Sequence, residues 1–384
     1  MSSEPSPRHP LPSRADRART QLSRWLFSPL AGITLGDWLR VLGQNGLRVP
    51  PAYWPRTALT TLGSPFNSLD AMLEERRFGQ ALAEVRVRRP VFVLGHYRSG
   101  TTHLHNLLCA DRRLTYTNNL RATFPRSFLR TETAKRRWGT LLAMRSRPQD
   151  DVELDLQVPG EDELALCGDC QLSTHMAWHF PQRAEFYARY LTFQRASSQE
   201  RETWKASLRR FARKLTFRAD GRTIVLKSPT HTAKVSMILE TFPDARFVHI
   251  DRDPYTLYSS TMKMERTVPP HFAYQHRDPQ VLSAAVLERL AEMYEAYLED
   301  RRTIPAGQLH ELSFAQLEAD PIASISSTYA ALDLPDFERS RPALQAYVAS
   351  LAAYGKNRYD ELEPALHRTV AERWAPYFEA FGYR

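Results

Sequence analysis

The stretch from Val91 to Asp111, VFVLGHYRSGTTHLHNLLCAD, constrains the fold of this chain more than any other. It opens with four apolar residues, bounded by Arg-Pro before and Gly after, a pattern that indicates a buried strand. A loop runs from Gly95 to Gly100, and apolar residues then recur at helical spacing. A strand, a glycine-bounded loop and a helix start form an arrangement that binds phosphate, because the N–H groups and dipole of a helix N-terminus favour an anion.

The spacing Gly95-x4-Gly100 matches the P-loop of nucleotide triphosphatases. In that motif a lysine and a hydroxyl residue follow the second glycine, whereas this chain has Thr101 and Thr102 there. The cation of the loop is Arg98, which lies between the two glycines. The loop is therefore predicted to bind phosphate, but not ATP in the usual way.

The run GHYRSGTTHLHNLL resembles the 5′-phosphosulfate-binding loop of sulfotransferases that use 3′-phosphoadenosine 5′-phosphosulfate (PAPS). It is most similar to bacterial members with the sequence R-S-G-T-T, whereas animal relatives usually have lysine at the position of Arg98. The resemblance implies that PAPS is the co-substrate and that Arg98 also takes part in catalysis. The residues that it assigns to binding the phosphosulfate are Arg98, Ser99, Gly100, Thr101 and Thr102.

Three further apolar runs predict strands at Thr223 to Lys227, Ala245 to Asp251 and Gln308 to Leu312. Helical patterns lie between them, and alternating strands and helices indicate a parallel sheet with helical crossovers. The fold class is therefore predicted as α/β, with a P-loop-like three-layer domain and a central, mostly parallel sheet. The predicted helices cover residues 201–217, 231–241, 282–300 and 314–332.

The segment from Phe247 to Ser260 follows the third of these strands and contains Arg-Asp-Pro, with a serine on the next helix. It resembles the 3′-phosphate-binding element of the same family, which implies that Arg252 and Ser260 hold the 3′-phosphate of PAPS. Alternatively, Arg252 pairs with Asp251 or Asp253 in a surface cluster, an arrangement that is common and contributes little to stability.

The segment Leu226 to His231, LKSPTH, also resembles a segment of bacterial sulfotransferases, at a strand end near the sulfate. Lys227 is a candidate for neutralising the bridging oxygen or the sulfuryl group. His231 is either a catalytic residue or a helix-start residue that orients its neighbours. Sulfuryl transfer also needs a base for the acceptor proton, but in principle no metal.

Glu161 is the favoured base, because the run Gly160-Glu-Asp-Glu resembles the acidic segment of bacterial relatives. Acidic residues at a helix start are also explained by the helix dipole alone. The other candidates for the base are Asp162, Glu163, His175 and His231.

Two further patterns have a functional and a plain structural interpretation. Cys167 and Cys170, with His175 and His179, have the residue types of a zinc site or a redox pair, but their spacing within a helical pattern favours simple packing. The loop from residue 354 to 359 contains Lys356 and Arg358, which resemblance to a late basic element of the family suggests as cofactor contacts. A surface loop is the alternative there, because the match is not strict.

The chain has 384 residues, 42% hydrophobic and 25% charged, which is typical of a globular protein. We expect a disordered basic tail at 1–24, a helical N-terminal extension at 25–89 and an α/β domain at 90–384, with a substrate lid within 145–199. A helix at residues 69–85 is predicted to direct Glu74, Glu75, Arg76 and Arg77 outward. Three cysteines and no visible signal peptide favour a cytoplasmic protein.

The sequence therefore predicts a PAPS-dependent sulfotransferase that acts on a hydroxyl or amine of a small-molecule, lipid or sugar acceptor. Peripheral membrane contact through residues 25–47 is an additional hypothesis, because Trp and Leu lie beside basic residues there. One alternative is a P-loop kinase that uses ATP, with Asp251 holding a metal. The formal net charge of +9 suggests a basic membrane-surface or nucleic-acid binding protein as another, although no nucleic-acid module is present. Neither the acceptor nor the oligomeric state is predicted.

Overall fold

The computed structural model describes residues 28–142, 157–351 and 362–384. Its centre is a five-stranded sheet with the order β2-β3-β1-β4-β5, in which every neighbouring pair is parallel. The strands are β1 (Val91–Leu94), β2 (Leu114–Tyr116), β3 (Thr223–Lys227), β4 (Arg246–Asp251) and β5 (Leu309–Ser313). The α/β fold class is confirmed. The edge strand β2 was not predicted, because three residues are too few to show a pattern.

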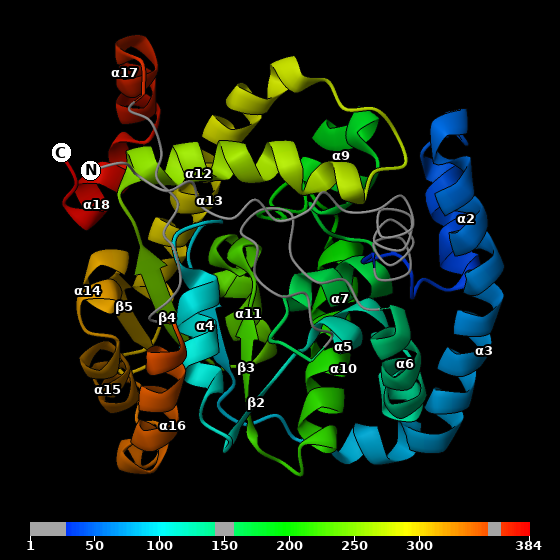
Figure 1. Ribbon diagram of the computed structural model, residues 1–384, viewed down its shortest axis with the longest axis horizontal. Helices are drawn as coiled ribbons and strands as arrows, with labels where there is room; N and C mark the ends of the chain where they lie inside the picture. The colour runs from blue at the N-terminus through cyan, green and yellow to red at the C-terminus, as the bar shows by residue number, and fades with distance from the viewer. Residues whose placement is uncertain (1–27, 143–156, 352–361) are drawn as a thin grey trace, which may run out of the picture.

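The central strand β1 separates the two halves of the core. Val91 and Val93 pack with α4, α15 and α16, whereas Phe92 and Leu94 pack with α10, α11 and α13 on the other face. This alternation follows from the period of two along a strand. Helices therefore cover both faces of the sheet, which gives the three layers that were predicted (Figure 1).

The helices range from single turns to one of 31 residues. Those before β3 are α2 (Leu35–Gln44), α3 (Trp54–Glu84), α4 (Thr101–Cys109), α5 (Asn119–Thr123), α6 (Phe128–Leu142), α7 (Asp162–Asp169), α8 (Met176–His179), α9 (Ala184–Ala188) and α10 (Ser198–Arg218). Those after β3 are α11 (Val235–Thr241), α12 (Pro254–Thr267), α13 (Leu282–Asp300), α14 (Phe314–Ala319), α15 (Pro321–Ala331), α16 (Phe337–Ser350), α17 (Pro364–Arg373) and α18 (Ala375–Phe381).

Proline explains two departures from the predicted helices. The helix expected over 231–241 begins as a 3-10 turn at Pro229–Ala233, and α11 starts only at Val235. The helix expected over 314–332 is broken into α14 and α15, because Asp320 leaves the helical conformation and caps α15 by accepting a bond from Ala323 N at 2.9 Å. Proline follows directly at the first position of α15, where its missing N–H costs nothing.

The predicted N-terminal extension contains α2 and α3, which contact each other along the edge of the molecule opposite α14 and α15 (Figure 1). Helix α3 has 31 residues and begins 15 residues earlier than predicted. The prediction that Glu74 points outward is wrong. Glu74 is buried and forms an ion pair with the buried Lys214 of α10, because burial of a charge requires an opposite charge beside it.

Residues 157–199 contribute α7, α8 and α9, and several of their side chains, including Leu166, Met176 and Phe180, belong to the main core. The predicted tail at 1–24 and residues 145–156 of the predicted lid lie outside the described residues. The domain boundaries and the lid stay predictions. In the described part of the chain, no helix combines the length and the apolar character needed to cross a membrane.

Candidate active site

The phosphate loop joins the end of β1 at Leu94 to the start of α4 at Thr101. Gly95 and Gly100 adopt φ angles of 137° and 106°, which side chains rarely tolerate. A Cβ on Gly95 would stand 2.5 Å from the carbonyl oxygen of Ile250, and one on Gly100 would stand 2.4 Å from the ring of Phe314. Both glycines are therefore required by backbone conformation and by the close approach of β4 and α14.

Bonds within and behind the loop fix its shape. Gly95 N donates to Thr232 Oγ1 at 2.8 Å, and Ser99 donates from both its N–H and its hydroxyl to the carbonyl of His96, at 3.1 and 2.8 Å. Ser99 is buried, so its hydroxyl holds the loop together. Among the described residues no side chain caps the N-terminus of α4, which leaves that end of the helix suited to an anion.

Arg98, Arg252 and Ser260 lie together, although the resemblance assigned Arg98 to the 5′-phosphosulfate and the other two residues to the 3′-phosphate. Arg98 Nε donates to Ser260 Oγ at 3.0 Å, and Arg252 Nη1 donates to the carbonyl oxygen of Arg98 at 2.9 Å. Arg98 itself has a φ of 70°, a sparsely populated conformation for a residue with a side chain. Two arginines from neighbouring strand ends thus form one cationic region between the phosphate loop and α12.

Two aromatic residues that the sequence did not indicate position Arg252. The guanidinium carbon lies 4.3 Å from the centre of the Phe314 ring, a favourable cation–π distance. The hydroxyl of Tyr377 accepts a bond from Arg252 N at 2.9 Å and donates to Arg252 O at 2.8 Å. Phe314 directly follows β5, so the rule that ligands bind at strand ends could have pointed to it. The contact of Tyr377 with Arg252 could be found only from the tertiary fold.

The end of β3 brings together Lys227, Glu161 and Thr102. Lys227 Nζ forms an ion pair with Glu161 Oε1 at 2.7 Å and donates to Thr102 Oγ1 at 3.4 Å. Glu161 is the N-cap residue of α7 and keeps 24% of its side chain exposed. A carboxylate and an amine therefore meet beside the first turn of α4.

The two acidic residues after Glu161 are buried and already bonded. Asp162 accepts bonds from Lys227 N, at 2.7 Å, and from His231 Nε2. Glu163 binds Lys234 Nζ through both carboxylate oxygens at 3.1 Å. Burial raises the pKa of each carboxyl, but His231 and Lys234 respectively outweigh it, so both pKa values lie below their ordinary range. Of the three acids, Glu161 alone faces the phosphate loop from a partly exposed position.

The two histidine candidates lie deeper than Glu161. His231 is fully buried, bonded to Asp162 and packed edge-on against Phe92. His175 is also buried, 3.5 Å from the hydroxyl of Tyr97, and burial lowers its pKa. These positions suit residues that orient the site from behind.

The cysteine pattern gives packing contacts. Cys167 Sγ contacts Met176 Sδ at 3.5 Å, and Cys170 Sγ donates to Leu166 O at 3.3 Å. Across residues 28–142, 157–351 and 362–384, no three His, Cys, Asp or Glu side chains are grouped to hold a metal ion. Lys356 and Arg358 lie outside the described residues, so their suggested cofactor contact stays a prediction.

Comparison with known proteins bears directly on this geometry. The sequence pattern of the sulfotransferase family matches residues 90–339. The chain belongs to the sulfotransferase family. It is 33% identical over 374 residues to the omega-hydroxy-beta-dihydromenaquinone-9 sulfotransferases Stf3 of Mycobacterium bovis and Mycobacterium tuberculosis, with 96% of each chain covered.

Solved sulfotransferases share the fold. The sulfotransferase STF9 from Mycobacterium avium aligns with 91% of this chain and 97% of its own, at a TM-score of 0.65 and 18% identity. The sulfotransferase STF1 from Mycobacterium tuberculosis aligns with 94% of this chain and 97% of its own, at a TM-score of 0.60 and 20% identity. Membership of this family favours the sulfotransferase hypothesis over the kinase hypothesis. Asp251, the metal-holding residue of the kinase hypothesis, instead accepts a bond from Tyr383 at 2.5 Å.

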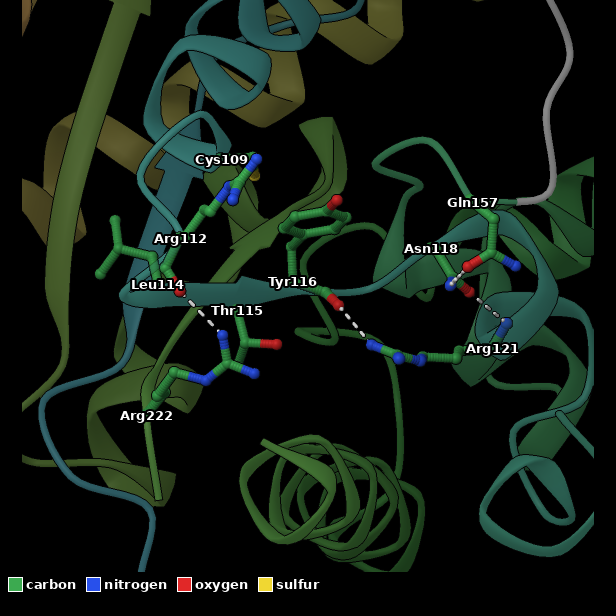
Figure 2. Close-up of a pocket in the computed structure, with 9 residues that line it drawn as sticks. All are labelled: Cys109, Arg112, Leu114, Thr115, Tyr116, Asn118, Arg121, Gln157 and Arg222. Carbon is green, nitrogen blue, oxygen red and sulfur yellow. Dashed lines mark hydrogen bonds between the residues drawn. The ribbon is translucent and has the colours of Figure 1, made fainter. Parts of the chain in front are cut away.

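A cavity of about 350 Å³ lies elsewhere on this sulfotransferase, beside the edge strand β2 (Figure 2). Three arginines line it, which makes it a second candidate for anion binding. However, Arg222 donates to the carbonyl of Arg112 at 2.8 Å, and Arg121 donates to Tyr116 O at 3.2 Å and to Glu132 at 2.9 Å. The cavity also touches Cys109, at the end of α4 opposite the phosphate loop, so it does not belong to the site described above.

Proposed function

We propose that this sulfotransferase transfers the sulfuryl group of PAPS to a hydroxyl group of an apolar acceptor. The observation that carries the proposal is the pair of cationic regions at neighbouring strand ends. One is the uncapped helix start behind Gly95–Gly100, with Arg98 in the loop and Lys227 beside it, and the other is formed by Arg252 and Ser260, both of which are bonded to Arg98. PAPS carries anionic groups at both its 5′ and its 3′ positions, and two separated grips suit such a molecule better than they suit ATP.

Each residue at the end of β3 has a role in this proposal. The acceptor oxygen attacks sulfur, forming an oxygen–sulfur bond as the bond between sulfur and the 5′-phosphate oxygen breaks. Glu161 takes the acceptor proton, because it is the partly exposed carboxylate that faces Thr102 through Lys227. Lys227 and the N-terminal N–H groups of α4 stabilise the negative charge on the departing 3′,5′-ADP. His231 acts through Asp162, which also binds the backbone of Lys227, and is a positioning residue.

Aromatic side chains beside the phosphate loop supply the argument for an apolar acceptor. Tyr97 of the loop lies 6.1 Å from Trp178, ring centre to ring centre, and Trp178 stacks on Phe272 at 6.4 Å. The Stf3 relatives are named for an ω-hydroxylated dihydromenaquinone, a lipid-like quinone with a terminal hydroxyl. The acceptor proposed for this chain is therefore a hydroxylated lipid of that chemical class.

The test uses the complete protein, PAPS labelled in its sulfuryl group, and two prenyl quinones in detergent micelles that differ only in the terminal hydroxyl. We expect label to enter the hydroxylated lipid and not its unhydroxylated counterpart. Label that enters neither lipid but does enter a sugar or a simple phenol would contradict the acceptor and retain the donor. Absence of transfer to every acceptor, together with failure to bind 3′,5′-ADP, would contradict the proposal as a whole.

A further inference from the structure

Helix α3 shows its polar side to the protein and its apolar side to solvent. Its buried residues include Arg56, Thr60, Ser64, Asn67 and Glu74, all polar or charged. Its exposed large side chains are apolar: Trp54, Leu62, Phe66, Leu69 and Met72. A surface helix of a globular protein normally has the reverse arrangement, with the apolar stripe facing the core.

Hydrogen bonds fix α3 in this orientation. Arg56 Nη1 donates to the carbonyl of Ala273 at 2.6 Å, and Asn67 Nδ2 donates to the carbonyl of Ala31 at 2.7 Å. The hydroxyl groups of Thr60 and Tyr274 share a hydrogen bond of 2.8 Å. Rotating the helix to bury its apolar side would break these buried bonds, each of which is costly to leave unmade. The apolar side is therefore held outward by the fold.

The large exposed apolar residues of α2, the turn after it and α3 are together named the α2–α3 apolar face: Leu39, Leu47, Trp54, Leu62, Phe66, Leu69 and Met72. Along α3 they recur mostly at intervals of three or four residues, so they share one side of the helix over about 27 Å. Leu62 and Phe66 expose 69% and 71% of their surface. Among the described residues, the other exposed large apolar side chains are Phe217 and Val281, with exposures of 36% and 54%.

The exposed charges along this face are mainly cationic. Between residues 35 and 77, the exposed charged side chains are Arg40, Arg48, Arg76 and Arg77, with one exposed carboxylate, Glu75. Asp70 is partly buried and pairs with Arg130 and Lys135, and Asp37 is buried and pairs with Arg40 and Arg126. A broad apolar stripe with a cationic border complements a bilayer that contains anionic lipids.

The segment that anchors α3 also reaches the proposed acceptor site. Residues 271 and 273 accept the bonds from Arg56, and Phe272 between them stacks on Trp178 beside Tyr97 of the phosphate loop. Residues 271–273 thus connect the helix that carries the apolar face to the aromatic cluster, which is formed by Tyr97, Trp178 and Phe272. A surface that rests on a membrane would hold the cluster near a lipid acceptor.

We propose that the α2–α3 apolar face docks on the surface of an anionic lipid bilayer and gives the enzyme access to a membrane-resident acceptor. This rests on the proposed lipid acceptor for its purpose, but docking itself can be measured without any acceptor. The helix lies along the bilayer surface with Leu62, Phe66 and Leu69 in the acyl-chain boundary and Arg48 at the headgroups. Trp54, whose indole N–H donates to Val49 O at 3.0 Å, suits the interface between them.

The experiment measures flotation of the protein with vesicles of phosphatidylcholine alone or mixed with phosphatidylglycerol. The test variant is Leu62→Glu/Phe66→Glu, and the matched control is Val281→Glu, which introduces a carboxylate at another exposed apolar position. We expect binding to mixed vesicles that falls at least about tenfold in the test variant and is unchanged in the control. Arg48→Gln should weaken binding about fivefold on mixed vesicles and have no effect on neutral ones.

Three controls separate this proposal from its competitors. The thermal unfolding midpoint and the affinity for 3′,5′-ADP should be unchanged in the test variant, which shows that it is folded with an intact site. Turnover of a detergent-dispersed acceptor should also persist, while turnover of the same acceptor in vesicles falls with binding. No vesicle binding by the wild type would overturn the proposal. So would a wild-type dimer that the test variant converts to monomers without affecting vesicle binding, because a second copy would then occupy the face.

Discussion

Two regions of this sulfotransferase depart from the usual distribution of polar and apolar side chains, and they do so in opposite ways. At the end of β3, Asp162, Glu163 and His231 are polar side chains with no exposure, and each carboxylate has a partner. On α3, Leu62 and Phe66 are apolar and exposed. The first region forms its ion pairs within the chain and lies beside Glu161 and Lys227, to which we assign the chemistry. The second region presents apolar surface to solvent, and we propose that a bilayer covers it.

The largest effect is expected at Lys227, which is the amine beside both Glu161 and Thr102. Lys227→Met should lower kcat about a thousandfold, because it removes a positioned charge that stabilises the leaving group. Steady-state sulfuryl transfer measures this. Lys205→Met is the matched control, since Lys205 pairs with Glu202 and Glu240 on the surface and should be neutral. Comparable losses in both variants would show that Lys227 has no special role.

Two adjacent carboxylates should separate activity from stability. Glu161→Gln should lower kcat about a hundredfold through loss of the base, with little change in unfolding. Asp162→Asn should instead lower the free energy of unfolding by about 3 kcal/mol, because it removes one partner of a buried pair. Denaturant titration and initial rates on both variants make the comparison. If Glu161→Gln kept full activity, the base would have to be sought elsewhere.

Acid should weaken the folded state through Glu163. Burial raises the pKa of Glu163, but the charge of Lys234 outweighs burial and leaves this pKa below the ordinary value of 4.5. The unfolded chain therefore takes up the proton at a higher pH than the folded protein. Stability is then complete above about pH 4.5 and declines as the pH falls toward the lower folded pKa. Glu163→Gln should flatten this decline in urea titrations from pH 6 to pH 3, at the cost of lower stability at neutral pH. An unchanged slope would indicate that other carboxyls control acid unfolding.

The smallest effects are expected on α3, where the two sides of one helix can be compared. Thr60→Val removes the partner of the buried Tyr274 hydroxyl and should cost about 1 kcal/mol in the free energy of unfolding. Phe66→Ser, on the exposed side, should change it by less than about 0.5 kcal/mol. Thermal or urea unfolding checks both. A large loss in Phe66→Ser would mean that this side is covered in the folded protein.

The same contrast explains what the sequence could predict. Short sequence motifs at strand ends identified Gly95–Gly100, Lys227 and Arg252. Because the strands are parallel, their carboxyl ends lie at the same edge of the sheet, which brings these residues together. Only the tertiary structure could show which of Glu161, Asp162 and Glu163 is partly exposed and which are buried in ion pairs. Their bonding partners lie 65 to 71 residues away in the sequence. The orientation of α3 was missed for a similar reason, since the buried bonds of Thr60 and Asn67 reach residues that no periodicity identifies.

The central claim is that the two grips hold PAPS, and calorimetric binding of its product 3′,5′-ADP tests it most directly. We predict micromolar binding of 3′,5′-ADP that is indifferent to magnesium, stronger than binding of 5′-ADP, and weakened at least about tenfold by Arg252→Ala. The Arg252 guanidinium lies beside the phosphate loop, 2.9 Å from the carbonyl oxygen of Arg98. This is the position at which we propose that the 3′-phosphate binds. Preference for 5′-ADP with magnesium would contradict the account.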